Sequence, residues 1–392
     1  MPRPKTVRRL VMKCALAAVS LTLGLGLAEV VARGFLPEVS DSFVIQTGAV
    51  EEKFHHKPLW GELPPPDPEA FRVAFIGDTF TYGYPVKDRA KAFPAVVGRL
   101  FSEGSVDGVG PRRVQAYNLG TPSYSPSIYG VVLRELAPVL KPHLIVVSLD
   151  DSDPQDDLFC KPLLKTDANG LPVSVYPGLP GVPDWLKPLA RQVKLVRLTF
   201  GLGDKVYRRF VAGDPKTLKR WESRLGHYRP GPGSDEQWAG AFRHTLALVG
   251  AMHAYCAARR IGLCVVNYPY PPAVTTKQVV AWRKMFHFGT DRLYEPTFHA
   301  AARSFCEGRR VPYYDFTPCL RSLPDHEGLF ISDDDPHYSP KGNALLAREL
   351  VRFLAPLVDT PTDPNYDRMN DRGGTVTTGP GGGKSSQESP TW

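Results

Sequence analysis

Five short apolar segments, each followed by a stretch with helical spacing, constrain the fold of this chain more than any other feature. The apolar segments are rich in β-branched and aromatic residues and lie at 72–77, 113–120, 143–149, 261–269 and 311–316. The helical stretches lie around 88–103, 125–140, 236–260, 276–308 and 339–357. Strands of this kind, joined by helical crossovers, form parallel sheets that are covered on both faces. The sequence therefore predicts an α/β fold, a three-layer α/β/α domain with a mostly parallel five-stranded sheet.

Polar residues follow the first three predicted strands, at the sheet edge where α/β proteins place their sites. Thr79 follows the first strand in the sequence Gly-Asp-Thr, Gly120 closes the second, and an acidic run at 150–153 follows the third. Near the C-terminus, Asp334 stands three residues before His337, just ahead of the last predicted helix. We expect the hydroxyl of Thr79 and the imidazole of His337 to meet at this edge.

These blocks resemble the SGNH/GDSL hydrolase family of esterases and acyltransferases. "FIGDTFTYG" is similar to the family's Gly-Asp-Ser block, with Thr79 in place of the nucleophilic serine. "NLGTPSYSP" offers Gly120 for the second block, and "PHLIVVSLDDSD" places Ser152 where the family has asparagine. The Asp-x-x-His block is intact as Asp334 and His337. The resemblance implies an SGNH/flavodoxin-like fold of the exported, membrane-anchored type.

The resemblance also implies roles for these residues. Thr79 attacks an ester carbonyl, His337 takes the hydroxyl proton, and Asp334 orients the imidazole and stabilises its cation. The backbone N–H groups of Thr79 and Gly120 hold the oxyanion, and Ser152 offers a third donor. The chemistry needs no metal or organic cofactor.

Two departures from the family pattern bear on activity. The methyl group of Thr79 restricts χ1 and crowds the approach to a carbonyl. Ser152 reaches less far than asparagine, and the loss of one oxyanion donor costs roughly 10²–10³ in rate. An alternative is therefore a catalytically decayed protein that binds a glycan or another partner. The acidic run has its own alternative: Ser152 or Asp153 caps a helix that Pro154 opens.

The N-terminal segment predicts export. Five basic residues precede an apolar run at 14–28, which is typical of a signal peptide or an N-terminal membrane anchor within 1–36. The rest of the chain would then be extracytoplasmic, either anchored or secreted. A proline-rich linker is expected at 37–70 and a hydrolase-like domain at 71–358, with an insertion at about 160–235.

Two further segments carry expectations of their own. Residues 184–200 have the spacing of an amphipathic helix, which would pack on the core, form a lid, or contact anionic lipid or glycan. The tail at 359–392 has almost no apolar residues and is expected to be disordered.

Charge and cysteine spacing exclude some classes of protein. The net charge of +8 is concentrated in the N-terminal segment and in 187–224, and no nucleic-acid motif accompanies it, so nucleic acid is not an expected partner. The cysteines lack metal-site spacing; Cys306 and Cys319 would form a disulfide or remain buried free thiols.

These observations predict an exported SGNH-type acyl-ester hydrolase or O-acyltransferase. Its substrate would be an ester, such as that of an acylated cell-envelope or extracellular glycan. The residues do not separate hydrolysis from transfer, because that depends on whether water or a sugar hydroxyl reaches the acyl-enzyme.

Overall fold

The computed structural model describes six stretches of the chain and scattered residues between 13 and 31. The six stretches are 63–84, 86–122, 124–175, 234–276, 293–332 and 335–359. Most of the predicted N-terminal segment, the greater part of the predicted linker, the predicted helix at 184–200 and the tail from 360 lie outside these residues. Each helix within the described part is too short or too polar to cross a lipid bilayer.

The predicted α/β fold is confirmed, with a five-stranded parallel sheet at its centre. The strands are β1 (Phe71–Ile76), β2 (Val114–Asn118), β3 (Leu144–Asp150), β6 (Gly262–Tyr268) and β7 (Tyr313–Asp315). Their order across the sheet is β2-β1-β3-β6-β7, and every neighbouring pair is parallel. All five carboxyl ends therefore reach the same edge of the sheet.

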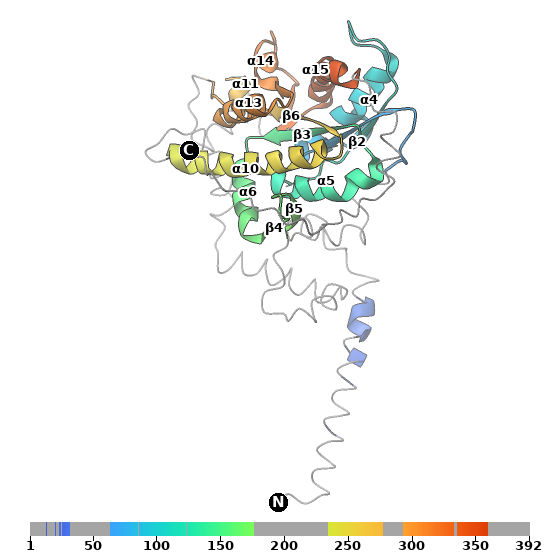
Figure 1. The fold of residues 1–392 in the computed structure, drawn as a ribbon, viewed down its shortest axis with the longest axis vertical. Coiled ribbons are helices and arrows are strands. Elements are labelled where there is room, and N and C mark those ends of the chain that lie inside the picture. The colour runs from blue at the N-terminus through green and yellow to red at the C-terminus, as the bar shows by residue number, and fades with distance from the viewer. Residues whose placement is uncertain are drawn as a thin grey trace, which may run out of the picture.

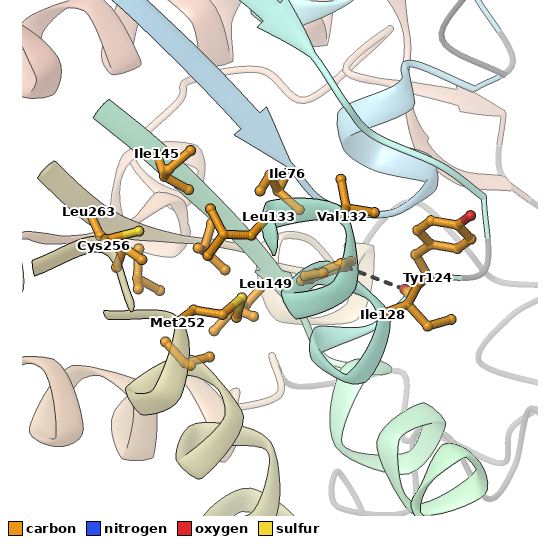
Figure 2. Packing of buried hydrophobic residues seen from close by; sticks show 14 of the residues in the cluster. Ile76, Tyr124, Ile128, Val132, Leu133, Ile145, Leu149, Met252, Cys256 and Leu263 are labelled. Carbon is orange, nitrogen blue, oxygen red and sulfur yellow. Dashed lines mark hydrogen bonds between the residues drawn. The ribbon is translucent and has the colours of Figure 1, made fainter. Parts of the chain in front are cut away.

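Helices cover both faces of the sheet, which makes the three layers (Figure 1). One face carries α4 (Phe93–Glu103) and α15 (Pro340–Val358), and the other carries α5 (Pro126–Leu140), α10 (Ser234–Ala257) and α13 (Thr297–Arg309). Figure 2 shows the second face, where side chains of the strands meet side chains of α5 and α10. Strand residues alternate between the two cores because successive side chains of a strand point to opposite faces.

Two predicted helix starts have different outcomes. Ser339 caps α15 by accepting a hydrogen bond from Gly342 N at 3.1 Å, and Pro340 is the first helical residue, as predicted. The helix after β3, α6 (Asp153–Cys160), begins at the predicted place, but the side chain of Ser152 makes no capping bond.

Several short elements are absent from the sequence prediction. They are the helices α3 (Thr79–Tyr82), α11 (Pro271–Val274) and α14 (Phe316–Arg321), and the antiparallel hairpins of β4 (Leu164–Thr166) with β5 (Pro172–Val175) and β8 (Phe330–Ser332) with β9 (Asp335–Tyr338). The predicted helix at 88–103 likewise begins with a separate 3₁₀ turn, Arg89–Lys91, before α4. Of these elements, α3 and β9 position the candidate site.

The last residues of the predicted linker pack along the edge strand β2. The side chain of Gln115 accepts from Asp67 N at 2.7 Å and donates to the carbonyl of Pro65 at 2.8 Å. Asp67 also pairs with Arg113 at 2.9 Å. These bonds cover part of the exposed edge of the sheet.

The disulfide prediction is wrong, and the alternative of free thiols holds for both cysteines. Cys306 is buried on α13, whereas Cys319 is half-buried on α14.

A buried histidine ties α13 to the carboxyl edge of the sheet. His299 is 1% exposed, and its Nδ1 lies 3.0 Å from Asp315 Oδ1 at the end of β7. Its Nε2 lies 3.6 Å from Asp151 Oδ1, one residue beyond β3. Burial lowers the pKa of His299, but the two carboxylates outweigh burial and raise it above the usual value. The imidazolium therefore neutralises charge at the ends of two strands.

We predict that His299→Ala destabilises the fold by about 3–5 kcal/mol at pH 6, because it leaves buried carboxylates without their cation. Because the folded-state pKa of His299 is raised, its contribution is fully present below about pH 6.5 and is lost as the pH rises through the folded-state value. Urea unfolding at pH 6 and pH 9 measures both effects. An equal loss at the two pH values would contradict the charged state.

Candidate active site

Thr79 lies where β1 turns into the short helix α3. Gly77 permits this turn, because a Cβ atom there would lie 2.1 Å from Thr81 Oγ1 and 2.8 Å from Ser148 Cβ. Asp78 is the N-cap of α3, and its Oδ1 accepts a hydrogen bond from Phe80 N at 2.9 Å. The turn thus places a half-buried hydroxyl at the carboxyl end of the second strand in the sheet order.

The two polar groups of Thr79 differ in their partners. Its hydroxyl donates to Asp78 Oδ2 at 2.8 Å. Its backbone N–H, which the family resemblance predicts as an oxyanion donor, has no acceptor among the described residues.

His337 lies on β9 and has a carboxylate partner. Its Nδ1 lies 2.6 Å from Asp335 Oδ1, which also accepts from the backbone N–H of His337 at 2.9 Å. Burial raises the pKa of Asp335, but the bonds from His337 outweigh burial and hold it below its usual value. The other ring nitrogen, Nε2, has no hydrogen-bond partner within the described part of the chain. This is the arrangement that a general base needs: one nitrogen fixed and the other open.

Phe80 brings the Thr79 turn and His337 to the same rim. The ring of Phe80 packs 4.9 Å from the ring of His337 and 5.6 Å from that of Tyr338, between centroids. Tyr84, just beyond α3, packs edge-on against His337 at 5.0 Å. No hydrogen bond joins Thr79 to His337 among these described residues, since the hydroxyl is bonded to Asp78.

Gly120 approaches α3 very closely. A Cβ atom on it would lie 2.2 Å from Tyr82 N and 2.5 Å from the carbonyl carbon of Thr81, so only glycine fits here. Its backbone N–H donates to Asn118 Oδ1 at 3.0 Å. To bind an oxyanion, this N–H would have to break its hydrogen bond to the side chain of Asn118.

Ser152 lies at the edge of the sheet but inside a buried acidic turn. It is 7% exposed, and its hydroxyl donates to Asp156 Oδ2 at 3.3 Å. Its backbone N–H donates to Asp150 Oδ1 at 2.6 Å. Both donors of Ser152 are therefore engaged within its own turn.

The acidic residues of α6 bond to neighbouring helices. Asp157 is fully buried and accepts from Ser125 Oγ, Ser127 N and Thr245 Oγ1, at 2.7, 2.8 and 2.7 Å. It thereby caps the start of α5 and joins α5, α6 and α10. Within the described residues, no group of three or more His, Cys, Asp or Glu side chains could hold a metal ion.

Asp334, the predicted partner of His337, lies outside the described residues. The partner that the structure places against the imidazole is Asp335. A signal for it exists in the sequence, because residues two apart share a face if 335–338 form a strand. The hydrogen bond from Thr79 to Asp78 was likewise missed, as was the exposed ring of Tyr84.

Comparisons with known proteins give only distant similarities, whose TM-scores carry no argument about this chain. No protein-family model matches the sequence, and no curated protein matches it. Several solved structures are similar in fold. A lipase/acylhydrolase from Enterococcus faecalis has 11% identity over 74% of this chain and 99% of its own, with a TM-score of 0.38. A catalytic mutant of an acetylxylan esterase from Geobacillus stearothermophilus has 12% identity over 74% and 96%, with a TM-score of 0.36.

A carbohydrate acetylesterase from Sinorhizobium meliloti has 12% identity over 73% of this chain and 99% of its own, with a TM-score of 0.37. At these values the similarity carries no inference about the activity of this chain. The site is defined by its own residues: a hydroxyl on a strand-to-helix turn, and a carboxylate-bound imidazole that packs on Phe80, the next residue of that turn.

We predict that Asp335→Asn lowers kcat more than Asp334→Asn does. The change at 335 replaces the carboxylate that holds His337 Nδ1 by a neutral amide, which permits the wrong imidazole tautomer; the same change in a serine protease lowers kcat about 10⁴-fold. Steady-state kinetics of the two variants, which differ by one position and share the same chemistry, measure the order. The reverse order would show that the Asp-x-x-His spacing of the family holds here.

Proposed function

We propose that the protein catalyses acyl-ester chemistry, either hydrolysis or O-acyl transfer, with Thr79 as nucleophile. The observation that carries this proposal is the shared rim: Phe80, the neighbour of Thr79, contacts His337, and Asp335 holds the opposite side of the imidazole. A hydroxyl, an oriented base and an unoccupied backbone N–H are the parts that attack on an ester carbonyl requires.

The reaction proceeds in two steps. Thr79 Oγ1 attacks the carbonyl carbon while its proton passes to His337 Nε2, and the oxyanion binds to Thr79 N–H. The bond to the leaving alcohol then breaks, and His337 returns the proton to the alcohol, which leaves an acyl-threonine. Water or an acceptor hydroxyl then attacks the carbonyl carbon of this ester while His337 takes its proton. The bond between the acyl group and Thr79 Oγ1 breaks, and His337 returns the proton to Thr79, which releases the acid or the new ester. Before the first step, the side chain of Thr79 must rotate about χ1, so that its hydroxyl leaves Asp78 and donates to His337.

An acylated glycan is the substrate class that we propose. The support is Tyr84, whose ring is 47% exposed beside His337 and offers a flat apolar surface next to the reacting centre. Sugar rings present apolar C–H faces that pack on such aromatic surfaces. If a sugar hydroxyl is held there, it competes with water for the acyl-threonine, and transfer replaces hydrolysis.

We also propose that the domain acts outside the cytoplasm, tethered or released through its N-terminal segment. The basic cluster and apolar run before residue 36 support this placement. Fractionation of cells that make the full chain, with and without 1–36, tests it. Equal distribution of the two forms would contradict it.

The nucleophile is tested with the full chain and short-chain nitrophenyl esters. Thr79→Ala and His337→Ala are expected to lower kcat/KM by at least about 10², the usual contribution of acid–base catalysis. Thr79→Ser is expected to raise kcat, because a hydroxyl without the adjacent methyl turns freely toward His337. Ser102→Ala, which removes an exposed hydroxyl on α4, is the matched control.

The same variants distinguish the enzyme from the alternative, a catalytically decayed protein that binds a glycan or another partner. Turnover that appears only in Thr79→Ser would show a site that has lost its nucleophile. No turnover in any variant, with glycan binding intact in Thr79→Ala, would favour the binding protein over the enzyme.

We predict that Tyr84→Ala raises KM for an acetylated oligosaccharide roughly fivefold, the effect of losing about 1 kcal/mol of ring contact. KM for nitrophenyl acetate should stay unchanged, since that substrate has no sugar ring. Tyr84→Phe keeps the ring and serves as the control. An equal rise in KM for both substrates would show that Tyr84 acts on His337 rather than on sugar.

A further inference from the structure

Two buried carboxyl groups lie beneath the candidate nucleophile. Asp78, directly before Thr79, is 8% exposed, and Asp150, the last residue of β3, is 2% exposed. Their strands, β1 and β3, are neighbours in the sheet, so the two side chains meet at its carboxyl edge.

The hydrogen bonds of the pair leave one oxygen without a donor. Both oxygens of Asp78 accept, from Thr79 Oγ1 at 2.8 Å and from Phe80 N at 2.9 Å. Asp150 Oδ1 accepts from Ser152 N at 2.6 Å. Asp150 Oδ2 is buried and receives no hydrogen bond from any described residue.

A proton is the simplest partner for that oxygen. Ionised carboxylates only accept hydrogen bonds, so a bond between Asp78 and Asp150 exists only if one of them is protonated. Two carboxylates that share a buried site do not both ionise at neutral pH, because each raises the cost of charging the other. Burial, followed by the charge and hydrogen bond of Asp150, raises the pKa of Asp78 well above its usual value.

The surroundings favour the protonated pair. Four more buried acids, Asp151, Asp153, Asp156 and Asp157, lie just beyond β3. Three buried tyrosines face the cluster, Tyr129 from α5, Tyr268 from β6 and Tyr338 from β9. Among the nearby histidines, His244 on α10 faces Asp157, but burial outweighs that charge and lowers the pKa of its imidazole. The other two are engaged by carboxylates. His299 lies between Asp151 and Asp315, and His337 is bonded to Asp335.

We propose that Asp78 and Asp150 share one proton, and that this acid pair positions the turn that carries Thr79 and the Ser152 turn for catalysis. The proposal deepens the function proposed above and, for its catalytic half, rests on it. The shared proton joins the end of β1, which carries the nucleophile, to the end of β3, which carries Ser152. It also leaves one negative charge instead of two beneath the forming oxyanion, which would otherwise be repelled.

Loss of the shared proton changes the folding stability in a definite direction. Because the folded state holds the proton more tightly than the unfolded chain, the stability from this pair is greatest at low pH. This contribution to stability decreases as the pH rises from about 4, the pKa of an aspartate in the unfolded chain, through the folded-state pKa. At high pH the two anions repel, and Thr79 and the Ser152 turn separate.

The test uses the full chain and Asp150→Asn, whose amide donates to Asp78 at every pH and so replaces the shared proton. The melting temperature of both proteins is measured from pH 4 to pH 9. The parent should lose about 2–4 °C more than the variant over this range, the shift expected for about 1 kcal/mol in a domain of this size. Asp78→Asn supplies a second variant in which the pair cannot ionise twice.

His299→Gln is the matched control for this measurement. It removes another group whose contribution decreases with rising pH, and it should keep the difference between the parent and Asp150→Asn. If the parent and both Asn variants follow the same pH dependence, the shared proton does not exist and the proposal fails, whatever the activity.

The catalytic half is read from kcat/KM against pH on a nitrophenyl ester. The parent should lose activity on the alkaline side, and Asp150→Asn should move that loss upward by at least about one pH unit. Asp78→Asn likewise cannot ionise, so its alkaline limb should move in the same direction as that of Asp150→Asn. An unmoved alkaline limb in Asp150→Asn overturns the positioning role. A parent without esterase activity overturns the proposed function, while the melting series still decides whether the proton is shared.

Discussion

The ring of Phe80 packs 4.9 Å from that of His337 and 5.6 Å from that of Tyr338, and this contact holds the candidate site together. The two segments that it joins are separated by about two thirds of the chain and belong to no common sheet. Phe80 also packs on Tyr268 and Tyr270, so α3, β6 and β9 share one aromatic cluster. Aromatic pairs of this kind contribute about 0.5–1.5 kcal/mol each beyond their burial. Tyr338 completes the cluster by donating its hydroxyl to the carbonyl of Pro269 at 3.0 Å.

The edge of the sheet beside this cluster is rich in buried acids, and each needs donors there. Asp157 has them from three residues on two helices, and Asp315 has them from His299 and Thr317. Burial raises the pKa of Asp315, but the bonds from His299 outweigh burial and lower it to about 2. Asp150 is different because one of its oxygens lacks a donor. A fold that satisfies the other carboxylates so fully leaves Asp78 and Asp150 to satisfy each other through a proton.

The central sheet could be predicted from the sequence because its strands are continuous apolar runs, such as 144–150, whose burial on both faces leaves a strong compositional signal. The hairpin that carries His337 could not, because its second strand reads Asp-Pro-His-Tyr and contains two residues that strands disfavour. That strand nevertheless determines which carboxylate meets the imidazole. Ser152 shows a second limit: its place at the helix start follows from Pro154, but the bond of its hydroxyl to Asp156 depends on packing. The burial of the acidic run is equally a tertiary property, since charge in a sequence usually indicates a solvated surface.

Thr79 shows why the local geometry matters more than the motif. Its β-branched side chain has few χ1 positions, so contact with Asp78 and contact with His337 are alternative states rather than extremes of a continuous motion. In the structure the hydroxyl occupies the first of them, at 2.8 Å from Asp78. A fully ionised Asp78 would hold this proton strongly, since hydrogen bonds to charged acceptors are about twice as strong as those between neutral groups. A carboxyl that shares its proton with Asp150 holds it more weakly. The β-branched side chain of Thr79 and the buried acid pair therefore act on the same equilibrium, and the second offsets the first.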